Sequence, residues 1–142
     1  MTIALPPYAD LLGIVVHETS EDGIILAMPF GDAVIGRPGF LHGGAIAGLM
    51  EMALAVTLHS ALGDEAALLP IKPINMTINF MRGGREVTTY ASAQIDRLGT
   101  RVVNVEAHAW QTDRHAPLAT ASCNFLRGEA KAETINSDTI SG

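Results

Sequence analysis

Residues 45–62 constrain the fold of this 142-residue chain more than any other segment. The segment is rich in Ala, Leu and Met, which are good helix formers. It ends at Gly63, and glycine favours the position that follows a helix end. Apolar side chains surround almost the whole predicted helix, in which Glu51 is the only charged residue. We therefore expect one long helix that the rest of the protein covers on most sides.

The sequence around this helix has the two-residue period of β-strands. Four strands are expected after the helix, over residues 74–80, 87–97, 101–112 and 118–127. Turn residues separate these segments, which predicts an antiparallel meander. Two earlier strands, over residues 14–16 and 24–28, join through a turn in which Gly23 supplies a positive φ. The expected fold class is α+β, with a curved antiparallel sheet of about six strands wrapped around one central helix.

Length and composition favour one globular domain. Hydrophobic residues make up 48% of the chain, which is enough for a core over residues 1–127, including a short helix over residues 6–12. Residues 128–142 are polar and lack an apolar period, so we expect a flexible C-terminal tail. Cys123 is the only cysteine and lies in an apolar run, where we expect a small buried hydrophobe.

The charge distribution argues against two classes of partner. The chain has a net charge of -6, and its nine Lys and Arg residues are scattered. Nucleic acids and anionic membrane surfaces both require clustered positive charge. The apolar helix is interrupted by Glu51, and we expect it to be too short to span a bilayer. No basic start precedes Pro6 and Pro7, so we expect a cytoplasmic protein.

Gly43 and Gly44 open the predicted helix directly after His42. Glycines let a ligand approach the backbone closely. The first N–H groups of a helix have no partner inside it, and the helix dipole adds partial positive charge there. Together these features can stabilise an oxyanion that develops on a carbonyl group. The alternative is a glycine pair that only lets the chain turn or pack tightly.

Glu51 is the second chemical feature of the helix. An isolated ionised carboxylate in an apolar setting is costly, so it must be paired, hydrogen-bonded or protonated. Burial favours the protonated form of a carboxyl group, which is one way in which enzymes tune a general base. The alternative is a carboxylate on the one wet stripe of the helix. The glycine pair on the same helix favours a functional role for Glu51.

The spacing of these features predicts an oligomer. Gly44 and Glu51 are seven positions apart, so they lie on one face of the helix, separated by roughly 10 Å along its axis. An oxyanion donor and a catalytic carboxylate must both lie within about 3 Å of the reacting group. Two antiparallel helices across a twofold axis meet this requirement. We therefore predict a homodimer with two composite sites, each using Gly43 of one chain and Glu51 of the other.

The sequence GFLHGGAIAGLMEMA at residues 39–53 resembles the hot-dog-fold thioesterases, in particular the phenylacetate-pathway (PaaI-like) branch. In that family a His-Gly-Gly sequence opens the central helix, and an Asp or Glu follows at the spacing of Glu51. The sequence INFMRGG at residues 78–84 is a second match, and the order of elements fits over residues 13–127. The resemblance implies a hot-dog fold that hydrolyses an acyl-coenzyme A thioester and needs no further cofactor.

The resemblance also implies roles for single residues. The backbone N–H of Gly43 would polarise the thioester carbonyl group, and Gly44 would leave room for the substrate. Glu51 would act as nucleophile or as general base on water. His42 orients the helix start in the family, and the alternative is a satisfied core histidine. Phe40 is a candidate for the wall of the substrate pocket.

Two positions depart from the family pattern. Gly36 stands where relatives often have Asn or Gln, and Pro73 stands near a position that is often Ser or Thr. In relatives those side chains help to place the water or the thioester. Asn75, Thr77 or Asn79 could compensate, and the alternative is that they are solvent-facing residues of a half-wet strand.

Coenzyme A carries phosphate groups, which basic residues should meet. Arginines flank two predicted turns, namely Arg82 and Arg85 around Gly83 and Gly84, and Arg97 and Arg101 around residues 98–100. Arginine suits bidentate contacts with phosphate. The alternative is that these are ordinary surface arginines at strand ends.

An acyl-CoA thioesterase is the leading functional hypothesis, with a homodimer as the smallest unit and a tetramer as an alternative. A hot-dog hydratase or dehydratase that acts on enoyl or hydroxyacyl thioesters is the second hypothesis. A non-catalytic acyl-CoA-binding protein is the third, and a structural protein without a ligand is the fourth. We expect no metal site, because His108 and His115 lack a nearby set of ligands.

Overall fold

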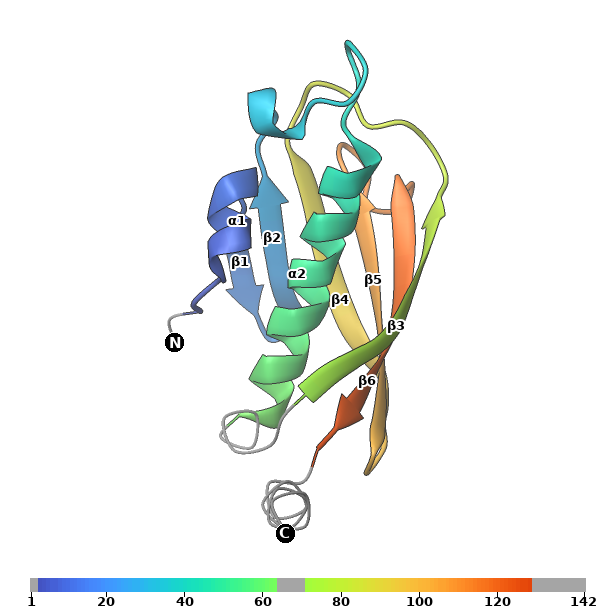
Figure 1. The fold of residues 1–142 in the computed structure, drawn as a ribbon. Helices are drawn as coiled ribbons and strands as arrows, with labels where there is room; N and C mark the ends of the chain where they lie inside the picture. Colours follow the sequence, from blue (N-terminus) through green and yellow to red (C-terminus); the bar gives the residue numbers. More distant parts are fainter. Residues whose placement is uncertain (1–2, 64–70, 129–142) are drawn as a thin grey trace, which may run out of the picture.

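The computed structural model describes residues 3–63 and 71–128 (Figure 1). Its elements in chain order are α1 (Pro7–Leu12), β1 (Val15–Ser20), β2 (Gly23–Met28), the short 3-10 helix η1 (Asp32–Val34), α2 (Gly43–Leu62), β3 (Ile71–Phe80), β4 (Thr89–Leu98), β5 (Val102–Trp110) and β6 (Ala119–Arg127). Every helix and strand expected from the sequence is present. The predicted flexible tail, apart from Gly128, lies outside the described residues.

The six strands form one sheet in the order β1-β2-β4-β5-β6-β3, and every neighbouring pair is antiparallel. Helix α2 lies across one face of this sheet, and α1 lies beside it over the β1–β2 end (Figure 1). The α+β architecture predicted from the sequence, a curved antiparallel sheet around one central helix, is therefore confirmed.

The predicted four-strand meander is wrong in one respect. Strands β4, β5 and β6 are neighbours in sequence order. Strand β3 pairs with β6 at the edge of the sheet and is not a neighbour of β4. Gly83 and Gly84 are therefore not a hairpin turn. They belong to a crossover segment, residues 81–88, that passes over the end of the sheet beside the start of α2 (Figure 1). The Leu41 N–H donates to the Gly84 carbonyl oxygen at 2.9 Å, which fixes this crossover.

Small side chains on the inner face of the sheet make room for α2. Buried alanines face the helix from three central strands, namely Ala91, Ala93, Ala107, Ala109, Ala119 and Ala121. Large apolar side chains of α2, including Leu49, Met50 and Leu54, fill the space above them and are fully buried. Helix and sheet together form one hydrophobic core. Cys123 belongs to it with 2% of its surface exposed, as expected for a small buried hydrophobe.

One stripe of α2 remains open. Gly44, Glu51 and His59 are exposed along it, and Ala47 and Ala55 are half-buried. The helix is otherwise covered, as predicted. By length and hydropathy alone it could cross a membrane, so the expectation that it is too short is wrong; more than half of it is buried inside the fold, as in the core helix of a globular protein.

Candidate active site

The start of α2 leaves one backbone donor uncommitted. The Gly44 N–H donates to Nδ1 of His42 at 2.8 Å, and the N–H groups of Ala45 and Ile46 donate to the His42 carbonyl oxygen at 3.0 and 3.2 Å. Three of the first four N–H groups therefore have acceptors. The N–H of Gly43 has none among the described residues. The helix start thus presents a single N–H group with the positive end of the helix dipole behind it.

His42 caps the helix rather than filling the core. Its side chain is exposed, so the alternative of a core histidine is wrong. Because Nδ1 accepts the Gly44 N–H, this nitrogen carries no proton in the capped form. A Cβ on Gly44 would lie 2.9 Å from that same Nδ1. Gly44 therefore makes room for the His42 side chain, and its predicted role in leaving room for a substrate stays a prediction.

Phe80 lies beside the uncommitted donor. The edge of its ring is 3.5 Å from the position that a Cβ on Gly43 would occupy, and 56% of the side chain is exposed. It is the last residue of β3, on the same sheet face as buried Ala119 of β6. The sequence analysis did not select Phe80, although it ends the alternating apolar pattern of residues 74–80. It supplies an apolar wall next to the Gly43 N–H.

Glu51 lies two helical turns beyond Gly43 and is exposed in the single chain. The burial that the sequence analysis expected for this carboxylate is therefore not provided by its own chain. Burial raises the pKa of the Cys123 thiol, and the negative charge of Glu51 raises that pKa further. Cys123 is on β6, so the Glu51 carboxylate lies near enough to this strand for its charge to act on the thiol.

The crossover segment gathers positive charge near the helix start. The guanidinium carbons of Arg37 and Arg85 lie 4.1 and 4.3 Å from the centre of the Phe40 ring. A Cβ on Gly83 would lie 3.0 Å from that ring, so the crossover packs tightly against it. Neither Arg37 nor Arg85 has a carboxylate partner among the described residues. Both guanidiniums therefore stack on the same ring, and neighbouring Arg82 is also exposed.

Gln111, which directly follows β5, forms hydrogen bonds with the crossover segment. Its Oε1 accepts the Arg85 N–H at 2.9 Å, and its Nε2 donates to the carbonyl oxygens of Arg85 and Val87 at 3.0 and 3.2 Å. Nε2 also lies 3.1 Å from the Thr89 hydroxyl. Gln111 and Arg37 belong to no sequence motif, so neither was predicted as a site residue. Only the fold brings them to residues 81–88.

Two predicted site residues on β3 face away from α2. Met76 is paired with buried Cys123, so Asn75 and Thr77 lie on the outer face of the sheet. Asn75 Oδ1 accepts from Asn124 at 3.1 Å, as part of an amide row that continues to Asn104. Within one chain, Asn75 and Thr77 therefore do not compensate for missing side chains beside Gly43.

Three other candidates are Gly36, Arg97 and Arg101, and their contact with a substrate stays a prediction. Gly36 packs against the backbone of His42, where a Cβ would lie 3.0 Å from the His42 Cα, so it supports the helix start. Arg97 and Arg101 flank the turn at the opposite end of β4, roughly 30 Å from the crossover along a ten-residue strand. The crossover and the β4–β5 turn thus lie at opposite ends of β4 (Figure 1). No group of His, Cys, Asp and Glu side chains within the described ranges could hold a metal ion.

Comparison with known proteins gives this geometry a context. Residues 38–118 match the thioesterase superfamily, and no curated protein matches the chain. A protein of Chromobacterium violaceum shares 33% identity, covering 84% of this chain and 82% of its own, with a TM-score of 0.67. A phenylacetic acid degradation-related protein of Ralstonia eutropha superposes with a TM-score of 0.74 at 21% identity, covering 87% and 92% of the two chains.

A third similar structure, a Bacillus halodurans protein solved with CoA, has a TM-score of 0.74 at 21% identity and covers 86% and 78% of the two chains. At this level of identity the similarity concerns the fold. The shared architecture is the hot-dog fold, as the sequence analysis expected.

Proposed function

Because the chain belongs to the thioesterase superfamily, we propose that it hydrolyses an acyl-CoA thioester to a free acid and coenzyme A. The observation that carries the proposal is the single uncommitted N–H of Gly43 at the start of a helix that bears Glu51 two turns further on. A hydrolase of this kind needs one donor for the carbonyl oxygen and one carboxylate for the attacking group. The phenylacetate-pathway branch is our more specific assignment within the superfamily.

In the proposed mechanism the thioester carbonyl oxygen accepts a hydrogen bond from the Gly43 N–H. Glu51 removes a proton from a water molecule, whose oxygen attacks the carbonyl carbon. The negative charge of the tetrahedral intermediate rests on the oxygen held by Gly43. The C–S bond then breaks, the thiolate of coenzyme A leaves, and it takes up a proton. Direct attack by the Glu51 carboxylate is the alternative first step, and both routes use the same two groups.

We propose that Glu51 acts on the carbonyl held by the Gly43 of a second copy of the chain. Their separation along one helix, about 10–12 Å, is too long for both to reach one substrate atom. The open edge of the molecule supports a partner there, because Ile74, Phe80 and Met81 of the β3 edge are each more than half exposed. A homodimer is thus the smallest active unit, and a tetramer is compatible with it.

The crossover cluster, which consists of Arg37, Phe40, Arg82 and Arg85, is our proposed site for the phosphates of coenzyme A. The guanidinium carbons of Arg37 and Arg85 lie 4.1 and 4.3 Å from the centre of the Phe40 ring. The two positive charges are therefore separated by no more than a distance close to the Debye length of about 8 Å, so they repel each other. A phosphate group would relieve the repulsion between them. The CoA-containing structure of the Bacillus halodurans protein supports this ligand class. A cytoplasmic location is also a proposal, compatible with the lone free Cys123.

The first test is thiol release from a panel of acyl-CoA thioesters. Glu51→Gln should lower kcat by about 10²–10⁴-fold, the usual contribution of a general base. Glu106→Gln, at an exposed carboxylate on the outer face of β5, is the matched control and should retain wild-type kcat. If Glu51→Gln hydrolyses at the wild-type rate, the catalytic assignment is wrong and a non-catalytic acyl-CoA-binding protein is favoured.

Gly43→Pro tests the oxyanion donor with little disturbance to the helix. Proline is tolerated at the first helical position, and His42, with φ -69° and ψ 132°, already has the extended conformation that precedes proline. The substitution replaces the N–H group by the proline ring and should cost about 10²–10³-fold in kcat. Gly43→Ala keeps the N–H, and its Cβ would make ordinary contacts with Phe80. It should retain most of the activity.

Mixed dimers test the composite site. Gly43→Pro and Glu51→Gln should each be inactive alone. A dimer of one chain of each kind contains one site with both wild-type groups, so random mixing should restore roughly a quarter of wild-type activity. If mixing restores no activity while native mass spectrometry of differently tagged chains shows that heterodimers form, both groups act within one chain and the composite site is refuted.

A further inference from the structure

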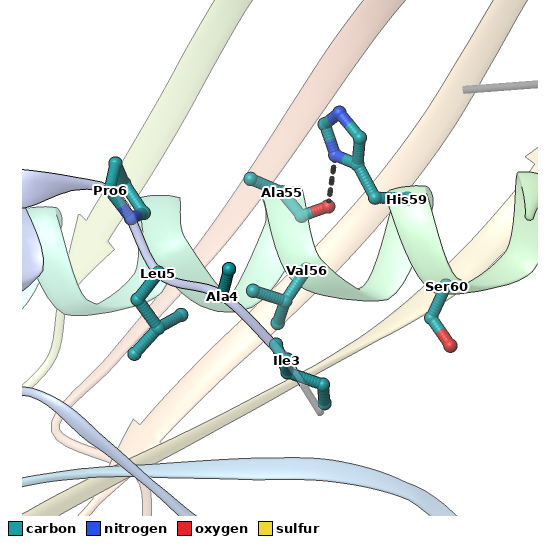
Figure 2. A pocket seen from close by; sticks show the side chains of 8 residues that line it. All are labelled: Ile3, Ala4, Leu5, Pro6, Ala55, Val56, His59 and Ser60. Carbon is teal, nitrogen blue, oxygen red and sulfur yellow. Dashed lines mark hydrogen bonds between the residues drawn. The ribbon is translucent and has the colours of Figure 1, made fainter. Parts of the chain in front are cut away.

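An apolar pocket of about 570 Å³ lies between the N-terminal segment and the C-terminal half of α2 (Figure 2). Residues 3–6 form one wall, and Ala55, Val56, His59 and Ser60 of α2 form the other. In Figure 2 the segment passes in front of the helix, and Ala4 and Ile3 are drawn nearer to Val56 than Leu5 is. Small-molecule pockets occupy about 300–1,000 Å³, so this volume suits one compact group.

The chemistry of the lining selects an uncharged apolar occupant. Ile3, Leu5 and Val56 supply aliphatic surface, and none of the lining residues within the described ranges is Lys, Arg, Asp or Glu. A charged group would lose its water here without gaining a partner. His59 and Ser60 are the polar members. Nδ1 of His59 pairs with the Ala55 carbonyl oxygen at 2.8 Å, so Nδ1 carries the proton and Nε2 of the neutral ring is an acceptor.

The pocket begins one helical turn beyond Glu51 on α2. Ala55 is one turn beyond Glu51 and His59 is two turns beyond it, on the same side of the helix. The distance from Glu51 to Ala55 is roughly 6 Å along the axis. Ala55, whose side chain is small and half-buried, is the lining residue of α2 nearest to Glu51 in sequence. A chain attached to a carbonyl carbon beside Glu51 would need to extend about one helical turn to enter the pocket.

We propose that this pocket binds the acyl group of the substrate. The inference rests on the proposed function and assigns a different part of the substrate to each protomer. In each composite site, one protomer supplies Gly43 and the arginines for coenzyme A. The other protomer supplies Glu51 together with the pocket that selects the acyl group. The expected substrates carry a neutral aliphatic or aryl acyl group, whereas acyl groups ending in a carboxylate are rejected.

The test compares acetyl-, hexanoyl-, decanoyl-, phenylacetyl- and succinyl-CoA. Wild-type protein should favour hexanoyl, decanoyl or phenylacetyl over succinyl. Ala55→Phe fills the entrance and should raise KM for the favoured substrates about tenfold while changing acetyl-CoA hydrolysis less than twofold. Leu5→Trp fills the pocket from the opposite wall and should act in the same direction. Ala61→Phe is the control, because Ala61 is exposed on α2 and does not line the pocket.

Mixed dimers then assign the pocket to one protomer. In the pairing of Gly43→Pro with Glu51→Gln, the active site takes its Glu51 from the Gly43→Pro chain. Ala55→Phe should change selectivity when it is placed in that chain and have no effect when placed in the Glu51→Gln chain. The reverse result would assign the acyl group to the protomer that holds coenzyme A and overturn the proposal.

The outcomes separate the two proposals. If wild-type protein hydrolyses none of the five thioesters, the proposed function fails. If it hydrolyses them and neither Ala55→Phe nor Leu5→Trp alters the selectivity, the function stands and the acyl pocket is refuted. Light scattering on each variant shows whether the dimer persists, and should Ala55→Phe dissociate it, Leu5→Trp alone decides.

Discussion

The two ends of the sheet carry the same sequence pattern and differ in what surrounds it. At one end Arg82 and Arg85 flank Gly83 and Gly84, and at the other Arg97 and Arg101 flank a turn that contains Gly99. The first segment is a crossover between distant strands, held by Phe40 and Gln111 beside the start of α2. The second is a hairpin between neighbouring strands.

This difference shows that a pair of arginines around glycine does not by itself predict a part of the proposed site. The hairpin places Arg97 and Arg101 far from Gly43, with exposed side chains. The crossover brings Arg82 and Arg85 to the helix start. Its Gly84 carbonyl oxygen accepts a hydrogen bond from the Leu41 N–H, and the Arg85 guanidinium stacks on the Phe40 ring. Position in the fold, rather than local sequence, therefore determines which pair can serve the proposed site.

The glycines at the two ends give the largest expected effects. A Cβ on Gly84 would lie 2.9 Å from Leu41, and a Cβ on Gly99 would lie 2.5 Å from the Val102 carbonyl oxygen. Gly84→Ala and Gly99→Ala should each lower the free energy of unfolding by about 1–3 kcal/mol, measured by urea denaturation. Only Gly84→Ala should also lower kcat/KM, because the shift passes through Leu41 to the helix start.

Gly31→Ala is the control for both variants, since no atom lies within 4 Å of its Cβ position and its φ of -173° suits any residue. It should leave stability and activity unchanged. Equal loss of kcat/KM in Gly84→Ala and Gly99→Ala would show that the two ends do not differ in function.

The arginines test the comparison directly. A charge-assisted hydrogen bond contributes about 1.5–3 kcal/mol, so Arg85→Ala should raise KM for an acyl-CoA by about tenfold or more. Arg37→Ala should do the same, because its guanidinium shares the Phe40 ring. Arg97→Ala should change KM less than twofold. Thiol release at low and high salt measures these effects, and a KM increase in Arg97→Ala equal to that in Arg85→Ala would contradict the assignment.

The parts of this site that the sequence predicted are those encoded within a few residues. Gly43, Gly44 and Glu51 lie on one helix, and the 3.6-residue period of the helix fixes their relative positions. The partner of β3 was not predictable in the same way. Its alternation shows that it is a strand, but strand order depends on contacts between residues far apart in the chain.

The same limit explains the residues that were missed or misplaced. Gln111 and Arg37 act through distant backbone groups and a distant ring, and no local pattern marks them. Asn75 lies on the outer face of the sheet because of its register with Asn124. The alternating sequence alone does not specify this register. Glu51 was expected to be buried because its helix is apolar, yet burial on that stripe depends on what lies beside it in an assembly.

Gln111→Leu should have a smaller effect than loss of an arginine. It removes the side-chain amide bonds that hold residues 85–89 while keeping the volume of the side chain similar. We expect a severalfold increase in KM for acyl-CoA with kcat nearly unchanged, because the crossover positions Arg85 and does not touch the reacting carbonyl group. Gln94→Leu, on the outer face of β4, is the control. A fall in kcat at unchanged KM would place Gln111 in the chemistry instead.

The smallest effect concerns a second arginine–aromatic contact. Arg114 lies 4.7 Å from the Trp110 ring centre, and its Nε is 3.4 Å from Nε2 of His108. Burial lowers the pKa of His108 below its usual 6.5, and the charge of Arg114 lowers it further. The unfolded state therefore binds this proton more readily, so the His108 contribution to stability is lost as pH falls below 6.5.

Arg114→Gln should raise the pKa of His108 in an NMR titration and still leave it below 6.5, because burial is the larger cause and remains. KM for acyl-CoA should not change, since this arginine contacts Trp110 and lies outside the crossover cluster. Stacking on an aromatic ring would then be shown to be insufficient for substrate binding. A rise in KM comparable to that of Arg85→Ala would instead extend the phosphate site to the outer face of β5 and weaken the contrast between the two ends of the sheet.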